Sequence, residues 1–277
     1  CQEAGYLVML FNLGNDGARK REGIEALASY QVEGFILNTL GADAQAAGEV
    51  ARHGKPAVLV DRRHPEMQAD FVSLDNTDAM GQAVRHLLGA GYRALVYVTE
   101  PTAGVSSRLE REGAFRSHVA AQSASLAAAS TATHGAAAGA AGLTAEVIES
   151  GEAQEAALLT RLTQARQRAG AAPLAIVASN AVTTLRVAGA CAALGWPLGA
   201  SAGTGQGPGV GFVGFDETEW APLVGPGLTT IAQPTDDIGR VAAHCLLDHL
   251  QGRRLPPRQI LLPGRLIMRG SSQAPSA

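Results

Sequence analysis

Polar side chains that could bind a small molecule follow the short apolar runs of this sequence. Asp216 comes directly after the apolar run 210–215. The same placement recurs for Asp61 and Arg62 after 57–60, Asp75 and Asn76 after 71–74, Asn180 after 174–179 and Gln233 after 228–232. Carboxylates accept hydrogen bonds from hydroxyl groups, arginine donates in a rigid fork, and amides do both. These groups suit a polyhydroxylated ligand such as a sugar.

Each of these residues also has a structural interpretation, as the N-cap of a helix or as one half of an ion pair between subdomains. For Asp75 and Asn76 the structural interpretation is favoured. For Asp216, Arg62 and Asn180 ligand binding is favoured.

The elements that must position these side chains follow from the pattern of apolar residues. Amphipathic stretches at helical spacing separate the apolar runs, as the positions of Met80, Ala83, Val84 and Leu87 illustrate. The predicted strands are 6–11, 34–37, 57–60, 71–74 and 95–98 in a first series, 143–148, 174–178 and 210–214 in a second, and 259–262 and 266–269 as closing strands; helices are predicted near 152–169 and 181–194, with a late crossover helix around 238–246.

Strands that alternate with helices indicate parallel sheets. Two such series predict an α/β chain of two doubly wound lobes with a cleft between them. In open α/β sheets, ligands bind outside the carboxyl ends of the strands. The polar residues that follow the strands therefore occur where this fold places a ligand.

Composition excludes several classes of function. The chain has 277 residues, 46% of them hydrophobic, which is enough for one large core or two smaller ones. The net charge is −3 and the basic residues are scattered, so we expect no nucleic-acid binding by these residues. No apolar run approaches the ~18 residues of a membrane span, and the start lacks a signal segment. Cys191 and Cys245 fall on apolar helix faces, as buried thiols in a reducing compartment do. These features predict a cytoplasmic protein without a membrane partner.

Catalytic and metal-binding motifs are also missing from the sequence. The seven histidines form no HExxH motif and no zinc spacing with cysteine. Residues 199–203 fit GxSxG but lack the preceding strand of a nucleophile elbow, and 209–214 fit GxGxxG but lie on a predicted strand. We therefore predict no enzyme activity, no catalytic residues, no metal and no cofactor.

Residues 120–142 consist almost entirely of Ala, Ser, Thr and Gly. Such a segment has too few large apolar side chains to pack firmly, although alanine alone can sustain a frayed helix. We interpret it as a surface insertion.

The whole chain, apart from this insertion, resembles the LacI/GalR family of sugar-responsive bacterial transcription repressors, in the effector-binding part. The resemblance rests on motifs that occur in order: VLVDRR, FVSLDNTDAMGQAVRHLLGAGYRALVYV, SSRLEREGAF, VASNAV, VGFDETEW, GLTTIAQPTDDIG and LLPGRLIMRGSS. It implies the type I periplasmic-binding-protein-like fold, in which two subdomains enclose a hinged ligand cleft.

The resemblance also implies roles for individual residues. The ligand-binding positions of the family fall on Asp61, Arg62, Arg111, Asn180, Asp216 and Gln233. Arg108 is a rival to Arg111, which is favoured by alignment on Phe115. Trp220 could provide an apolar face for a sugar ring, or belong to the core or its rim. Ala181 departs from the family pattern, which has an acidic residue after the asparagine.

The implied organisation is an N-terminal subdomain of residues 1–100 and 234–252 and a C-terminal subdomain of residues 101–233 and 253–277. The first strand of the family fold, the hinge and the helix-turn-helix head are expected to be missing, so that operator DNA would be bound only through that missing head. The implied mechanism is closure of the cleft on a sugar-like effector, which changes operator affinity in a homodimer. The alternative is a periplasmic sugar-binding protein of a transporter, which has the same two lobes.

Overall fold

The computed structural model describes residues 1–12, 17–38, 48, 50–132, 142–151, 154–199, 209–253 and 255–274. The chain forms two compact units. Unit 1 comprises Cys1–Asp75, Ala103–Ser107 and Pro234–Pro263, and unit 2 comprises Asn76–Thr102, Arg108–Gln233 and Gly264–Ala277. The two units are described separately below.

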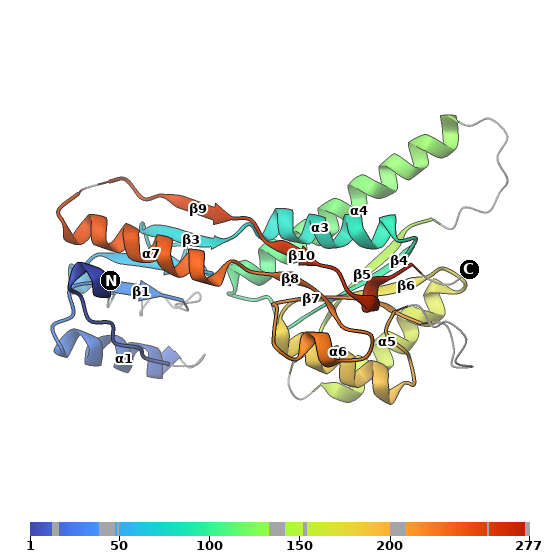
Figure 1. Cartoon of the computed structure of the whole chain (residues 1–277), viewed down its shortest axis with the longest axis horizontal. Coiled ribbons are helices and arrows are strands. Elements are labelled where there is room, and N and C mark those ends of the chain that lie inside the picture. Colours follow the sequence, from blue (N-terminus) through green and yellow to red (C-terminus); the bar gives the residue numbers. More distant parts are fainter. Residues whose placement is uncertain are drawn as a thin grey trace. The chain divides into compact units, whose positions relative to one another are not determined.

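Unit 1 is a parallel sheet covered by a helix on each face (Figure 1). The strands are β1 (Phe35–Leu37), β2 (Ala57–Val60), β3 (Asp70–Leu74) and β9 (Gln259–Leu262), in the order β1-β2-β3-β9, and the helices are α1 (Gly17–Ser29) and α7 (Thr235–Leu250). Leu59 and Phe71 pack in one cluster with Ile24 of α1, whereas Val58 and Val72 pack in another with α7. Successive strand residues point to opposite faces, so each helix is held by alternate side chains.

Unit 2 contains a larger sheet with helices on both faces (Figure 1). The strands are β4 (Ala94–Thr99), β5 (Thr144–Glu149), β6 (Leu174–Ala178), β7 (Gly211–Phe215), β8 (Thr229–Ala232) and β10 (Arg265–Ile267), in the order β10-β8-β7-β6-β4-β5. All neighbours are parallel except β10 and β8. The helices are α3 (Asn76–Gly89), α4 (Ser106–Ala132), α5 (Glu155–Ala169) and α6 (Ala181–Ala193). Short 3-10 helices also occur: η2 (Ala221–Leu223) and η3 (Gly270–Ser272) in unit 2, and η1 (Gln2–Ala4) in unit 1.

The central strands of unit 2 are buried along their whole length. Every residue of β4, β6 and β7 is buried, as expected for a parallel sheet that is covered on both faces. Val96 and Val98 pack in the cluster that contains α5 and α6, whereas Tyr97 stacks on Phe115 of α4 with ring centroids 5.4 Å apart. This rigid sheet fixes the positions at which its strands end.

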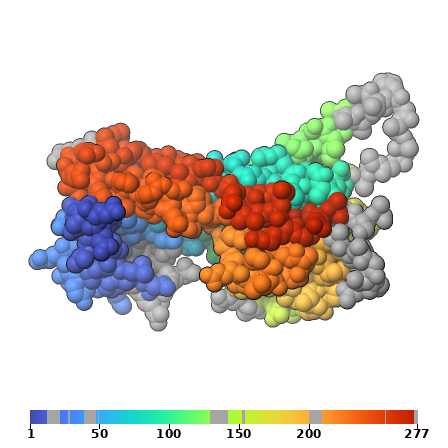
Figure 2. Space-filling model, viewed as in Figure 1, coloured from blue at the N-terminus to red at the C-terminus, as the bar shows by residue number. Residues whose placement is uncertain are grey.

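The C-terminal segment is fastened to α3 within unit 2. Gln82 donates a hydrogen bond to the carbonyl oxygen of Gly264, and His86 lies 2.7 Å from the hydroxyl of Ser272. Figure 2 shows this segment, in red, lying against the blue-green surface of α3. The chain thus returns to unit 2 after it has supplied β9 to unit 1.

Several predicted elements differ from the structure. The strand predicted at 6–11 is wrong: these residues form no strand, and the side chain of Leu7 is 94% exposed. An apolar run becomes a strand only where another strand can pair with its backbone. The last strand covers Arg265–Ile267 instead of 266–269, because its pairing with β8 begins at Arg265.

The segment 120–142 is helical over much of its length. Helix α4 continues to Ala132, and its residues 124–128 are exposed, so the first part of the alanine-rich segment is an exposed extension of a helix, in keeping with the helical alternative from the sequence. Alanine has the highest helix propensity of all residues, which allows a helix without a buried face. Residues 133–141 lie outside the described residues.

The predicted subdomain boundaries differ from the two units at 76–100, at 103–107 and at 253–263. Residues 76–100 belong to unit 2 because β4 pairs with β5 and β6 there. Residues 253–263 belong to unit 1 because β9 pairs with β3. Sequence order alone does not say which sheet a strand joins.

Candidate functional site

Four neighbouring strands of unit 2 end at the same edge of the sheet, and a polar residue follows each of them closely. These residues are Glu100 after β4, Asn180 after β6, Asp216 after β7 and Gln233 after β8. Parallel strands bring their carboxyl ends together. The sheet therefore gathers residues that lie far apart in the sequence.

Asp216 is held in a conformation that links two of these strands to a helix. Its φ is 74°, in the left-handed region that aspartate tolerates better than most residues. Its carboxylate accepts hydrogen bonds from the backbone N–H of Ala181 (3.0 Å) and from Nε2 of Gln233 (2.5 Å). The structure thus brings Asp216 and Gln233 together, and Asp216 helps to cap α6.

Asn180 is the N-cap of α6. Its Oδ1 accepts a hydrogen bond from the backbone N–H of Thr183 (2.8 Å), and its Nδ2 donates to Oε2 of Glu100 (2.7 Å). The N-cap interpretation of Asn180 agrees with this geometry, and the amide keeps a second Nδ2 hydrogen, so ligand binding stays a prediction. With Ala181 in place of the family's acidic residue, the start of α6 is capped by Asn180 and Asp216.

Arg111 is buried beside these strand ends. Its Nε donates to Oδ1 of Asn76 (2.7 Å), its Nη1 donates to the carbonyl oxygen of Ser179 (2.6 Å), and its guanidinium lies 4.6 Å from the ring centroid of Phe215. The side chain of Asn76 also donates to Glu110 (2.8 Å). Asn76 thus orients the guanidinium of Arg111, and its interpretation as an N-cap or part of an ion pair stays a prediction.

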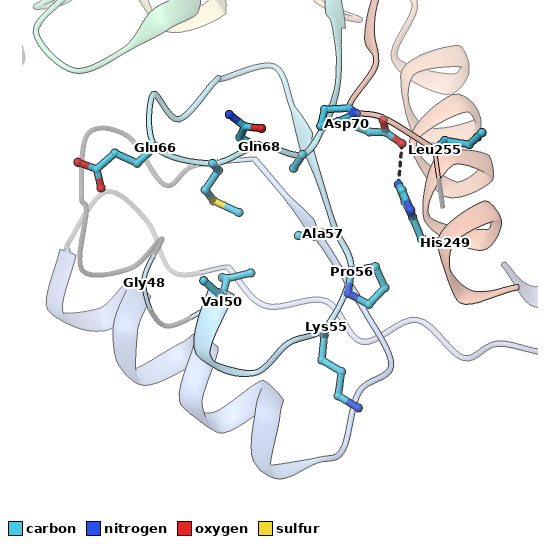
Figure 3. Close-up of a pocket in the computed structure, with 14 residues that line it drawn as sticks. Gly48, Val50, Lys55, Pro56, Ala57, Glu66, Gln68, Asp70, His249 and Leu255 are labelled. Atoms are coloured by element: carbon cyan, nitrogen blue, oxygen red, sulfur yellow. Dashed lines mark hydrogen bonds and ion pairs between the residues drawn. The ribbon is translucent and has the colours of Figure 1, made fainter. Parts of the chain in front are cut away.

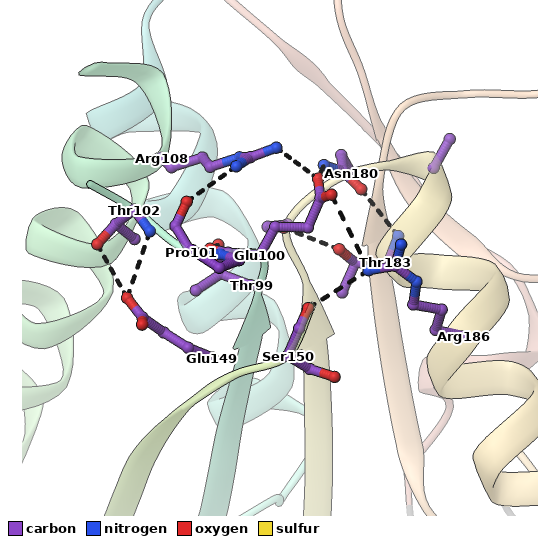
Figure 4. A network of polar contacts seen from close by, with 12 residues as sticks. Thr99, Glu100, Pro101, Thr102, Arg108, Glu149, Ser150, Asn180, Thr183 and Arg186 are labelled. Carbon is purple, nitrogen blue, oxygen red and sulfur yellow. Dashed lines mark hydrogen bonds and ion pairs between the residues drawn. The ribbon is translucent and has the colours of Figure 1, made fainter. Parts of the chain in front are cut away.

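Arg108 and Glu100 form an ion pair at the end of β4 (Figure 4). Nη2 of Arg108 lies 2.6 Å from Oε2 of Glu100, and Nη1 donates to the carbonyl oxygen of Pro101 (2.8 Å). Glu100 is the residue at this edge that our sequence reasoning missed. The signal that selects Asn180, a polar residue one or two positions after an apolar run, also marks Glu100.

Trp220 lies at the start of η2 and is partly buried against the core cluster of unit 2. This contact corresponds to the core or rim alternative. Its role as an apolar face for a ligand stays a prediction.

Asp61 and Arg62 follow β2 in unit 1. Asp61 has φ 62°, and its backbone N–H donates to the carbonyl oxygen of Val72 (3.1 Å). Nε of Arg62 lies 3.5 Å from Oδ2 of Asp61. The end of β2 therefore has a left-handed aspartate, as the end of β7 does in unit 2.

Unit 1 also has a cavity of about 490 Å³ at the opposite edge of its sheet, where β2 and β3 begin (Figure 3). Val50, Pro56 and Ala57 line it together with Asp70 and His249. Nε2 of His249 lies 3.0 Å from Oδ2 of Asp70. None of the predicted ligand-binding residues lines this cavity.

Asp70 also accepts hydrogen bonds from the backbone and the guanidinium of Arg258 (both 2.7 Å). Burial raises the pKa of Asp70, but the hydrogen bonds from Arg258 and His249 outweigh burial and leave the pKa below its ordinary value. This ion pair joins β3 to the segment that leads into β9.

In the described part of the chain, no three His, Cys, Asp or Glu side chains are grouped so that they could hold a metal ion. Among the helices that the structure describes, none is both long and apolar enough to span a membrane.

Comparison with known proteins identifies the family. Residues 84–272 match the family described as periplasmic binding protein-like domain. The chain is 39% identical over 274 residues to the HTH-type transcriptional regulator PtxS of Pseudomonas plecoglossicida, covering 98% of this chain and 71% of the relative. The chain belongs to the LacI family of transcriptional regulators. Among its relatives is also the regulator KdgR of Bacillus subtilis, 29% identical, covering 98% of this chain and 73% of that protein.

A solved structure supports the fold of this LacI-family regulator. A LacI family transcriptional regulator from Enterococcus faecium with bound ribose matches with a TM-score of 0.74 and 20% identity, covering 99% of this chain and 90% of that one. The relatives are transcriptional regulators, so the regulator interpretation holds over the transporter alternative.

Proposed function

We propose that this LacI-family regulator senses a sugar or sugar derivative at the carboxyl edge of the sheet of unit 2. The observation that carries the proposal is the group of hydrogen-bonded side chains on neighbouring strand ends, with Asp216 bonded to Gln233 and Asn180 capping the same helix that Asp216 caps. The ribose in the Enterococcus faecium structure supports a sugar as the ligand class.

The proposed roles follow from the chemistry of each group. Asp216 has oxygen lone pairs left to accept from hydroxyl groups, and Asn180 and Gln233 can donate or accept further hydrogen bonds. Arg111, buried and oriented by Asn76, donates from its guanidinium. Asp61 and Arg62 of unit 1 are proposed to bind the same ligand, and Arg108 and Trp220 are proposed as weaker contributors.

Calorimetric titration with a panel of pentoses, hexoses, disaccharides and sugar acids tests this proposal. We expect at least one compound to bind, and Asp216→Asn to weaken that binding by roughly 10- to 100-fold, because a charge-assisted hydrogen bond is worth ~1.5–3 kcal/mol. Asparagine also tolerates the left-handed backbone of this position, so the fold should be kept. Asp216→Ala should abolish detectable binding.

Asp237→Asn is the matched control, because Asp237 is an exposed carboxylate in the first turn of α7 that forms an ion pair with Arg240. It should bind as the wild type does. Unchanged affinity in Asp216→Asn would reject the proposed site. The same titration on Asp61→Asn tests whether unit 1 contributes.

We further propose that the ligand changes the affinity of the intact regulator for operator DNA. The relatives are named as HTH-type regulators, which supports a DNA partner and a cytoplasmic location. A ligand shifts such an equilibrium only by its different affinity for two conformations. Gel-shift titration of the intact regulator with the sugar found above tests this step.

A homodimer is proposed as the working assembly. Val182 and Leu185 on α6 are 48% and 53% exposed, and Leu223 in η2 is 81% exposed. The two elements follow the adjacent strands β6 and β7. Large apolar side chains that are exposed near one another mark interaction surfaces.

A further inference from the structure

Glu100 holds together the polar side chains at the end of β4. Its carboxylate accepts hydrogen bonds from Nη2 of Arg108 (2.6 Å) and Nδ2 of Asn180 (2.7 Å), and its Oε1 lies 3.9 Å from Nη1 of Arg186 (Figure 4). One carboxylate therefore lies beside two guanidinium groups and an amide that is proposed to bind the ligand.

These charges are largely withdrawn from water. The side chains of Glu100, Arg108 and Arg186 are 18%, 16% and 21% exposed. Charges act on each other more strongly where water is partly excluded. The neighbouring carboxylate of Glu149 accepts instead from Thr102, through its hydroxyl (3.0 Å) and its backbone N–H (3.3 Å). Of the two carboxylates, Glu100 is therefore the one that balances the positive charge of Arg108.

Glu100 also determines how Asn180 faces a ligand. The Oδ1 of Asn180 is used by Thr183, and one Nδ2 hydrogen is used by Glu100. The remaining Nδ2 hydrogen is a donor, so Asn180 can donate a hydrogen bond to a ligand. A hydroxyl oxygen or a carboxylate oxygen of a sugar can each accept this hydrogen bond. The charges near Asn180 therefore determine which kind of sugar binds more tightly.

We propose that Glu100 is a specificity-determining residue, which lowers the affinity of the site for an anionic sugar relative to the neutral sugar with the same skeleton. The proposal rests on the sugar site described above. In the wild type, Arg108 is paired with Glu100, and the carboxylate of an anionic sugar would be repelled by the carboxylate of Glu100. In Glu100→Gln, Arg108 loses its carboxylate partner and favours an anion.

The test compares sugars that differ only in a carboxylate: D-glucose with D-glucuronate, and D-galactose with D-galacturonate. Calorimetry gives, for each pair, the ratio of acid affinity to neutral affinity. In Glu100→Gln this ratio should rise by at least about fivefold, the factor expected for unit charges about 4 Å apart in water. Arg108→Met should lower the ratio. Glu149→Gln, which removes a carboxylate from the neighbouring strand end, should change it by less than Glu100→Gln.

An equal loss of affinity for both sugars of a pair in Glu100→Gln would mean that Glu100 only supports the fold, and would overturn the proposal. If circular dichroism shows that Glu100→Gln does not fold, Arg108→Met decides: a lower ratio supports the proposal and an unchanged ratio overturns it.

A measurement without sugar separates this inference from the proposed function. Without the carboxylate of Glu100, Arg108 should bind inorganic sulfate, so added sulfate should raise the Tm of Glu100→Gln more than that of the wild type. If no sugar binds the wild type but sulfate raises the Tm of Glu100→Gln more than that of the wild type, the proposed sugar site is rejected and the charge role of Glu100 is supported. If sulfate raises the Tm of the wild type and of Glu100→Gln equally and no sugar binds, the sugar site and the charge role of Glu100 are both rejected.

Discussion

Asp61 and Asp216 show how much one residue depends on its backbone. Both directly follow a strand, and both adopt a left-handed φ, 62° and 74°. The position of each could be predicted from the sequence, because a polar residue ends an apolar run. The hydrogen bonds of Asp216 to Ala181 and Gln233 could not, because these partners follow other strands.

The cysteines provide a prediction at the scale of single residues. Cys191 and Cys245 are buried, which confirms their interpretation as small apolar residues. Burial raises the pKa of the Cys191 thiol to about 12, so almost no thiolate forms at pH 8. With iodoacetamide at pH 8, mass spectrometry should find Cys1 modified, Cys191 and Cys245 protected, and all three modified in urea. Modification of Cys191 at the same rate with and without urea would contradict its burial.

At the scale of elements, Asp70 connects three parts of unit 1. It begins β3, and it binds His249 at the end of α7 and Arg258 just before β9. Its side chain is completely buried, whereas Arg258 remains 30% exposed. The ion pair therefore fastens a strand to segments nearly two hundred residues later in the chain.

Asp70→Asn should lower the free energy of unfolding at pH 7 by ~3 kcal/mol, because it removes a buried carboxylate that accepts hydrogen bonds from Arg258 and His249. The folded-state pKa of Asp70 lies below the ordinary value of 3.8. The carboxylate therefore contributes stability above about pH 3.8 and loses that contribution as the pH falls through the folded-state pKa. Urea unfolding of both proteins at pH 7, 5 and 3 should show the difference shrinking only at the lowest pH.

The matched control for Asp70→Asn is Asp237→Asn, since Asp237 is 53% exposed. Its free energy of unfolding should stay within about 0.5 kcal/mol of the wild type. A difference between Asp70→Asn and the wild type that is equally large at all three pH values would contradict the assigned pKa shift.

At the scale of the whole molecule, the proposed dimer makes a measurable prediction. Sedimentation should give twice the chain mass of 28.4 kDa. Leu185→Glu places a charge on the exposed apolar surface of α6 and should convert the dimer to a monomer, because a buried unpaired charge is costly. Leu126→Glu on α4, at a site 43% exposed, is the control and should remain dimeric. A monomeric wild type would reject the dimer, and a dimeric Leu185→Glu would reject this surface.

The sequence by itself determined the alternation of strands and helices and the polar residues that end the strands. Apolar periodicity is a local property, and most strands of both sheets occur where it predicts them. It failed at residues 6–11, where an apolar run forms no strand within the part of the chain that the structure describes, and it did not predict the alanine-rich end of α4, whose residues 124–128 are exposed.

Only the tertiary structure decided which strands share a sheet and which side chains meet. Residues 76–100 join unit 2, and β9 joins unit 1, because strand pairing depends on backbone partners that are distant in the sequence. Glu100 follows an apolar run as Asn180 does, but only the structure shows why it matters. Its importance lies in its contacts with Arg108, Asn180 and Arg186, and the sheet brings it close to Asn180 and Arg186, which follow another strand.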